Sequence, residues 1–217
     1  MLIAMTADDA SPTTDSDLAA DAPATRKRAR PGERREQILQ ALAAMLQRPG
    51  AERITTAALA AELGVSEAAL YRHFASKAQM FEALIDFIES SVFGLVNQIT
   101  ARELGARAQA ARVVEAVLRF GEANPGLARV MAGDALVLEH ERLQQRMNQL
   151  FDKLETALHQ CLREERAAAT PDDDARVAAS VLAAFAAGRL QRFARTGFRR
   201  RPTERLDACL HQILLKS

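Results

Sequence analysis

Hydroxyl, phenolic and basic side chains gather in one short stretch of the chain, between residues 55 and 77. Thr55 and Thr56 open one helical segment, Ser66 opens the next, and Lys77 stands at the start of a third. A helix N-terminus has free backbone N–H groups, which a hydroxyl can cap and which also attract a phosphate. Tyr71, the only tyrosine, lies at the end of the second segment. These residues at helix starts indicate contacts to the phosphates of a nucleic acid.

The segment from residue 59 to residue 70 has the pattern of two short helices joined by a tight turn. Ala60 is small where two helices must approach, and Gly64 supplies the unusual backbone angles of the turn. Such a helix-turn-helix unit places its second helix in the DNA major groove. The side chains expected to face DNA along this second helix are Ser66, Glu67, Ala68, Ala69, Tyr71 and Arg72. A methyl group of Ala68 or Ala69 can contact a thymine methyl.

Each of these residues also has a purely structural interpretation. Thr55, Thr56 and Ser76 cap helices whether or not they touch phosphate. Tyr71 can be a core residue, although the adjacent Arg72 favours DNA. His73 is interpreted as a packed, hydrogen-bonded histidine and not as a base reader.

Charge is distributed unevenly along the chain, although the formal net charge is only +1. Residues 1–25 carry five aspartates and no lysine or arginine, whereas residues 26–35 carry six basic side chains. Residues 1–30 are therefore expected to form a disordered acidic tail and a basic arm. Residues 26–35 could merely aid solubility, but beside a helix-turn-helix they are expected to follow the DNA backbone or enter the minor groove.

Leu and Ala dominate the rest of the chain, and apolar residues recur at three- and four-residue spacing. This predicts an all-α protein of nine or ten helices and no strands. A DNA-binding domain is expected over residues 31–78, and a helical dimerisation and partner-binding domain over residues 79–217. A long helix with a stripe that includes Leu95 should link them, and another should run from about Leu136 to Arg166 before a polar connection at 167–174. The first helix is expected to bury an apolar stripe and to end at Pro49–Gly50.

Several function classes have no support in the sequence. The four histidines show no metal-ligand spacing, the two cysteines lie far apart, and no nucleophile–base motif or phosphate-binding loop is present. An enzyme, a metal site and a cofactor are therefore not expected. No signal peptide or membrane-spanning run is found, so a cytoplasmic protein without a membrane partner is expected.

The motifs together resemble the TetR family of DNA-binding proteins. The resemblance rests on residues 54–56, 59–60, 64–66, 70–74 and 76–77. Ala68 departs from the glycine that is frequent there, and Leu63 departs from a frequent alanine. Further segments at 66–74, 85–89, 120–127, 142–151 and 201–203 resemble the family's subgroup of nucleoid occlusion factors, across residues 34–217.

The resemblance implies a homodimer through the last two long helices, with two recognition helices about 34–36 Å apart on palindromic DNA. Val181, Ala184 and Gly188 fit such an interface, although their spacing is also that of ordinary packing inside one subunit. The subgroup implies a nucleoid-associated protein that pairs its dimers on DNA and antagonises the division GTPase FtsZ. Phe87, at the edge of the linking helix's stripe, is the candidate FtsZ contact, and Phe93 is also expected to be partly exposed. The alternative is a ligand-responsive transcriptional repressor of the same family.

Overall fold

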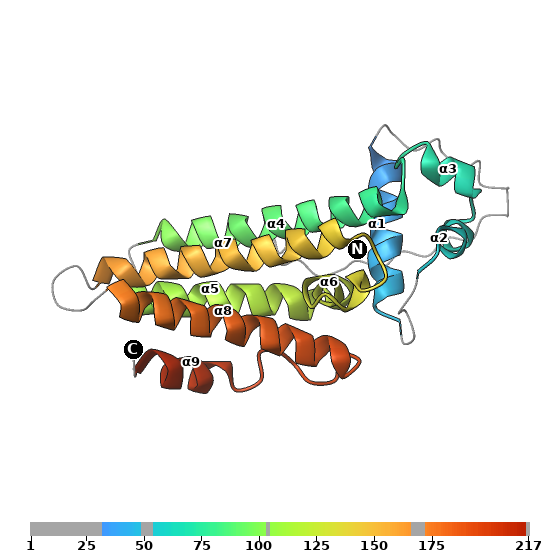
Figure 1. The fold of residues 1–217 in the computed structure, drawn as a ribbon. Coiled ribbons are helices and arrows are strands. Elements are labelled where there is room, and N and C mark those ends of the chain that lie inside the picture. The colour runs from blue at the N-terminus through green and yellow to red at the C-terminus, as the bar shows by residue number, and fades with distance from the viewer. Residues whose placement is uncertain (1–31, 49–53, 103–104, 166–171, 216–217) are drawn as a thin grey trace, which may run out of the picture.

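The computed structural model describes residues 32–48, 54–102, 105–165 and 172–215. Every regular element in these ranges is helical, which confirms the predicted fold class (Figure 1). The elements are α1 (Glu33–Leu46), α2 (Thr56–Leu63), α3 (Glu67–Tyr71), α4 (Lys77–Thr100), α5 (Ala106–Ala123), α6 (Pro125–Met131), the 3₁₀ helix η1 (Asp134–Leu136), α7 (Glu141–Glu165), α8 (Asp172–Arg195) and α9 (Leu206–Leu215). Within the described ranges, none of these helices is long and apolar enough to cross a membrane.

A small N-terminal module is formed by α1, α2 and α3, at one end of the molecule (Figure 1). The predicted stripe of α1 is confirmed, with Ile38 and Leu42 fully buried. Leu59 from α2 and Leu70 from α3 pack into the same core, and Phe74 closes it. The predicted stop at 49–50 lies outside the described residues, and α1 already ends at Leu46.

The C-terminal bundle contains the long helices α4, α5, α7 and α8, with α9 along one side (Figure 1). α4 and α7 both start beside the small module and run away from it, so these two neighbours are parallel. The core of the bundle is dominated by leucines at helical spacing from α7 and α8, among them Leu143, Leu150, Leu154, Leu158, Leu182 and Leu190. Their burial confirms the apolar faces expected from the sequence.

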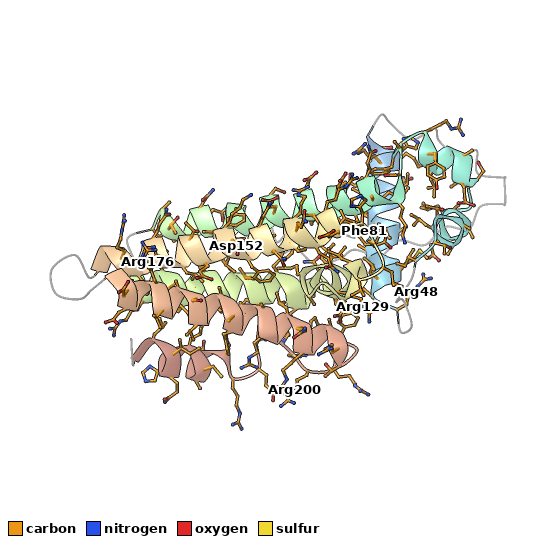
Figure 2. The ribbon with its side chains drawn as sticks, in the orientation of Figure 1. Arg48, Phe81, Arg129, Asp152, Arg176 and Arg200 are labelled. Carbon is orange, nitrogen blue, oxygen red and sulfur yellow. The ribbon has the colours of Figure 1, made fainter. Side chains whose placement is uncertain are left out.

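The small module is joined to the bundle where α6 packs against α1. A Cβ atom at Gly126 would lie 2.0 Å from the backbone oxygen of Ala43, so the two helices touch backbone to backbone. Asn124 is the N-cap of α6, and Pro125 is its first residue, a position where the missing N–H of proline is tolerated. Arg129 also donates a hydrogen bond of 3.4 Å to the carbonyl of Arg48 at the end of α1 (Figure 2). The junction is therefore tightly packed and depends on a residue without a side chain.

Three sequence-based expectations about the bundle are wrong. α7 begins at Glu141, because Gly133 adopts a left-handed conformation (φ 81°) and the chain makes a 3₁₀ turn at 134–136 before the helix. Helix α8 begins at Asp172, inside the expected connection, of which residues 167–171 lie outside the described part. Leu95 is 37% exposed although Val92 and Val96 beside it are buried, so Leu95 lies off the buried face of α4.

Candidate nucleic-acid interface

The turn between α2 and α3 is closed by Gly64, which adopts a left-handed conformation with φ 62° and ψ 38°. The N–H of Gly64 donates to the carbonyl of Ala61, and the N–H of Val65 donates to that of Ala60. This pair of bonds is the Schellman motif, which satisfies the last carbonyls of a helix. The predicted role of Gly64 is therefore confirmed, and the turn brings the start of α3 close to the start of α2.

Three hydroxyls cap helices α2, α3 and α4, whereas Thr56, which was also expected to cap, donates to Glu67 instead. The Oγ1 of Thr55 accepts from the N–H of Ala58 at 3.1 Å, and the Oγ of Ser66 accepts from the N–H of Ala69 at 3.3 Å. The Oγ of Ser76 likewise accepts from the N–H of Gln79 at 3.2 Å. A hydroxyl that accepts a bond still has a proton to donate. Capping and a phosphate contact are therefore compatible at the exposed Thr55.

The starts of α2 and α3 are connected by polar side chains. The hydroxyl of Thr56 donates to a carboxylate oxygen of Glu67 at 2.5 Å, and the hydroxyl of Tyr71 lies 3.5 Å from the same Thr56 oxygen. Tyr71 is 46% exposed, which contradicts its interpretation as a core residue. The structure thus brings these three predicted residues together on one exposed surface.

The nine residues predicted to contact DNA differ in exposure. Thr55, Ser66, Glu67, Ala68, Tyr71 and Arg72 are exposed, whereas Thr56, Ala69 and Lys77 are half-buried. His73 is also exposed, so its interpretation as a packed histidine is wrong. It lies after α3 has ended, where the chain turns toward α4 at the surface. His73 therefore joins the candidate interface, although the sequence pattern did not select it.

Arg35 is the described part of the basic arm that contacts the helix-turn-helix. Its guanidinium lies 4.2 Å from the centroid of the Phe74 ring and donates to the carbonyl of His73 at 3.1 Å. Arginine stacks well on aromatic rings and keeps its charge in this position. Arg35, the last residue of the basic arm, is thus held against the chain just after α3. Residues 26–31 of the arm lie outside the described part.

Lys77 occupies a different environment from the other candidates. Its ammonium forms an ion pair with Glu139, in the turn between η1 and α7, and lies 5.7 Å from the centroid of the Phe81 ring. No sequence pattern indicated Glu139, because 62 residues separate it from Lys77. The predicted phosphate contact of Lys77 therefore has a carboxylate competitor within the same chain.

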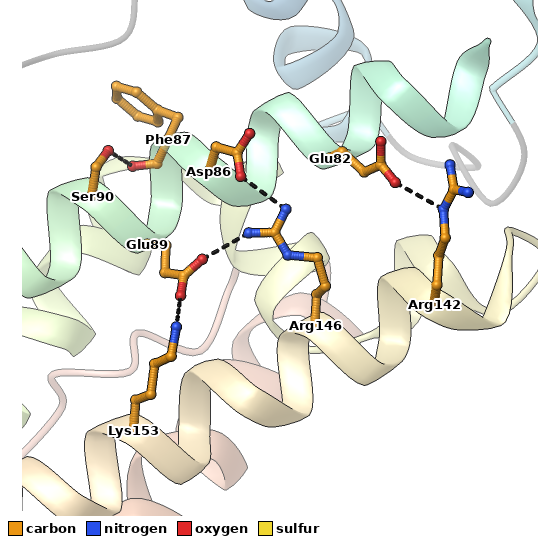
Figure 3. Close-up of polar contacts among 8 residues, drawn as sticks. All are labelled: Glu82, Asp86, Phe87, Glu89, Ser90, Arg142, Arg146 and Lys153. Carbon is orange, nitrogen blue, oxygen red and sulfur yellow. Dashed lines mark hydrogen bonds and ion pairs between the residues drawn. The ribbon is translucent and has the colours of Figure 1, made fainter.

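An ion-pair ladder holds α4 against α7 (Figure 3). Arg142 contacts Glu82 at 2.8 Å, and Arg146 contacts both Asp86 and Glu89 at 2.8 Å. Lys153 forms a further ion pair with Glu89. The hydrogen bond from Lys153 holds the pKa of Glu89 below its ordinary value, against an opposing effect of burial, and Arg146 adds to the lowering.

Phe87 projects from α4 away from the ion-pair ladder (Figure 3). Its ring is half-buried and packs against Phe120 of α5, with ring centroids 6.5 Å apart. Phe93 is half-buried as well. The expected partial exposure of both rings is confirmed, and Phe87 and Phe120 form an aromatic pair between α4 and α5.

An apolar strip on α8 is uncovered in the single chain. Val177 is 62% exposed and Val181 is 46% exposed, and Ala184 is exposed one turn further on. A Cβ atom at Gly188 would meet nothing within 4 Å. The spacing noted in the sequence is thus not explained by packing inside this subunit.

The described residues contain no group of three or more His, Cys, Asp or Glu side chains that could hold a metal ion. This arrangement of hydroxyls at helix starts, a short exposed helix and basic side chains around it is chemically suited to bind phosphates and base edges of DNA.

The fold and this helix-turn-helix define a regulator of the TetR type. Residues 38–84 match the family model of bacterial regulatory proteins of the tetR family, and residues 107–216 match a tetracyclin repressor-like C-terminal domain of the SlmA-like kind. The chain is 51% identical over 178 residues to the nucleoid occlusion factor SlmA of Citrobacter koseri, covering 81% of this chain and 90% of that protein. It is 49% identical over 177 residues to SlmA of Idiomarina loihiensis, with the same coverage.

The fatty acid degradation regulator FadR of Bacillus halodurans has the same fold, with a TM-score of 0.69, 17% identity, and coverage of 86% of this chain and 97% of that one. The similarity to FadR shows only the fold, whereas the identity of about half of the aligned residues over both modules identifies the family. The chain belongs to the SlmA nucleoid occlusion factors of the TetR family.

Proposed function

We propose that this protein is a nucleoid occlusion factor that binds palindromic chromosomal DNA as a dimer and, when bound, antagonises assembly of the FtsZ ring. The observation that carries the proposal is the identity of about half of all aligned residues with SlmA proteins over both modules. An identity confined to the helix-turn-helix would have indicated only a DNA-binding protein. In this role the protein is cytoplasmic and associated with the nucleoid.

The DNA contacts of the proposal are divided between phosphate and base. Thr55, Thr56 and Lys77 approach phosphates from helix N-termini, and Tyr71 and Arg72 reach the backbone or a base from the end of α3. The first turn of α3 faces the major groove with Ser66, Glu67, Ala68 and Ala69. The exposure of most of these side chains supports the assignment.

Dimerisation is assigned to the uncovered strip of α8. Apolar side chains that are half exposed in one chain gain stability when a second copy covers them. Gly188 has space on its outer side, which permits close approach of a partner helix. A two-fold axis there would place two copies of α3 on the same side of the assembly, as a palindrome requires.

A first experiment tests the DNA contact of Thr55 separately from its capping role. In Thr55→Asp the carboxylate keeps the N-cap of α2, since aspartate is a preferred capping residue, but it repels phosphate. We expect unchanged helicity and thermal stability, and DNA affinity at least tenfold lower in fluorescence anisotropy at fixed salt. Thr55→Ser, which keeps the hydroxyl, is the matched control and should bind like the wild type. Equal affinity of all three proteins would remove Thr55 from the interface.

A second experiment tests the division partner. FtsZ assembly with GTP is followed by light scattering, with this protein added in the presence or absence of its selected palindrome. We expect suppression of polymers chiefly by the DNA-bound protein. Polymers that are unaffected while DNA binds would support a ligand-responsive repressor in place of a division antagonist.

Phe87 is the proposed contact for FtsZ, because its half-buried ring forms an edge between α4 and α5 that a short peptide segment can cover. Phe87→Ala should bind DNA normally and lose most of the effect on FtsZ. Full inhibition by Phe87→Ala with intact DNA binding would exclude this residue.

A further inference from the structure

The ion pair between Lys77 and Glu139 connects the first residue of α4 with the turn before α7. The side chain of Lys77 is 22% exposed and that of Glu139 is 12% exposed. The attraction between two charges shielded from water to this extent is stronger than on the open surface, where an ion pair usually contributes little to stability. Lys77 is thus held by a carboxylate in the absence of DNA.

The turn that carries Glu139 is fixed at both ends by backbone hydrogen bonds. The N–H of Glu139 donates to the carbonyl of Leu136 at 3.0 Å, and the N–H of Leu143 donates to that of His140 at 2.9 Å. Between these points, Val137 and Leu138 are each 66% exposed. Two apolar side chains thus stand at the surface directly beside the residue that holds Lys77.

A DNA phosphate at the N-terminus of α4 and the carboxylate of Glu139 require the same ammonium group. Both are oxygen anions, and Lys77 binds either as a point charge. We propose that Glu139 competes with DNA phosphate for Lys77, so that DNA binding exchanges the intramolecular ion pair for an intermolecular one. This inference rests on the proposed DNA-binding function of Lys77. It makes Glu139, which is placed in the C-terminal module, a determinant of DNA affinity.

The exchange also changes the contacts of the turn before α7, so the C-terminal module differs between the free and the DNA-bound protein. Once Lys77 has turned to a phosphate, Glu139 has lost its cation, and only the Arg142–Glu82 ion pair still joins this region to the start of α4. This turn then opens more often, and the environment of Val137 and Leu138 depends on whether DNA is bound.

The test measures DNA affinity by anisotropy, at two salt concentrations, for a set of variants. Glu139→Gln keeps the size of the side chain and removes the charge, and we expect it to bind the palindrome about threefold to tenfold more tightly than the wild type. Lys77→Gln should bind more weakly, and adding Glu139→Gln to it should produce no further change. Glu141→Gln is the matched control, because Glu141 is an exposed carboxylate in the first turn of α7 and is not the partner of Lys77. It should leave affinity nearly unchanged.

Hydrogen exchange of the amides of Glu139 and Leu143 provides a second readout. In the wild type these amides should exchange faster with DNA than without it. In Glu139→Gln they should exchange fast in both states, while the core amides of α7 stay protected and show that the protein is folded.

Several outcomes would overturn the inference. They are an unchanged or weaker affinity of Glu139→Gln, an equal tightening by Glu141→Gln, or a tightening that persists without Lys77. If these occur while Thr55→Asp still weakens binding, the proposed function stands and only the role of Glu139 is lost. If the wild type binds no palindromic DNA, both proposals fail together.

Discussion

The small module and the bundle are stabilised in different ways. α2 buries only two of its eight residues and α3 only one of its five, whereas α5 buries eight of its 18 residues. In the small module most of the buried area comes from α1, and hydroxyl caps and the turn at Gly64 add to the stability of α2 and α3. A helix that reads DNA must keep most of its surface in water, so little apolar area remains to hold it in place.

The difference shows how stability and function are divided within one chain. Local hydrogen bonds stabilise a helix end without covering its outer face, whereas packing of side chains covers both partners. The module therefore keeps an open reading surface, and the bundle supplies most of the buried area. Three substitutions test this division, in order of expected effect on the free energy of unfolding.

The junction between the two regions should be the most sensitive position. Gly126→Ala places a Cβ atom 2.0 Å from the carbonyl oxygen of Ala43, and because this neighbour is backbone, α1 and α6 must separate. We expect a loss of about 3 kcal/mol in urea denaturation. Gly94→Ala, in the middle of α4 with nothing near its Cβ, is the control and should gain up to about 1 kcal/mol. Similar stability of both variants would mean that the junction is loose.

The turn at Gly64, between α2 and α3, should have the second-largest effect on the free energy of unfolding. Gly64→Ala places an L-residue at φ 62°, with nothing near the added Cβ, so that only backbone strain changes. We expect a loss of about 1–2 kcal/mol and weaker DNA binding. Gly197→Ala imposes the same strain in the bundle, at φ 60°. It should lose similar stability but retain DNA affinity, and a loss of DNA affinity in both variants would show that the two regions are not independent.

A substitution in the ion-pair ladder between α4 and α7 should have the smallest effect on the free energy of unfolding. Glu89→Gln removes one carboxylate from Arg146 and Lys153, and we expect a loss of about 0.5–1 kcal/mol at pH 7. Because the pKa of Glu89 is lower in the folded protein than in the unfolded chain, its contribution is complete above the ordinary carboxyl range. It disappears as the pH falls through the lowered value. The difference between wild type and variant should therefore vanish in acid, whereas Asp152→Asn, at an exposed site on α7, should differ little at any pH.

The sequence predicted those features that depend on residues close together in the chain. Thr55 and Ser66 are predictable as caps and Gly64 as the turn residue, because each acts on backbone atoms within a few positions. The leucine stripe of α7 was identified because 3.6-residue periodicity marks one helix face. The expected start of α7 at Leu136 is wrong, because residues 136–138 continue the apolar pattern while Gly133 redirects the backbone.

Features that depend on distant residues could not be predicted from the same patterns. Glu139 reaches Lys77 only because α4 and α7 begin side by side. No sequence pattern marks Gly126 as a contact residue, because its approach to Ala43 follows from how α1 crosses the end of the bundle. The exposure of His73 depends on where the short α3 ends. All three features depend on how the helices pack in three dimensions, which local sequence patterns do not encode.

The parallel arrangement of α4 and α7 has an electrostatic consequence. Each helix has a dipole whose positive end, worth roughly half an elementary charge, lies at its N-terminus. Both N-termini lie at the end of the bundle next to the small module, so the two dipoles add there instead of cancelling as they would in an antiparallel pair. Helices α5 and α8 run in the opposite direction (Figure 1), so the positive potential is local to the starts of α4 and α7 and does not extend along the whole bundle. At physiological salt such a potential reaches only about 8–10 Å, so it acts on charged groups directly beside these two helix ends.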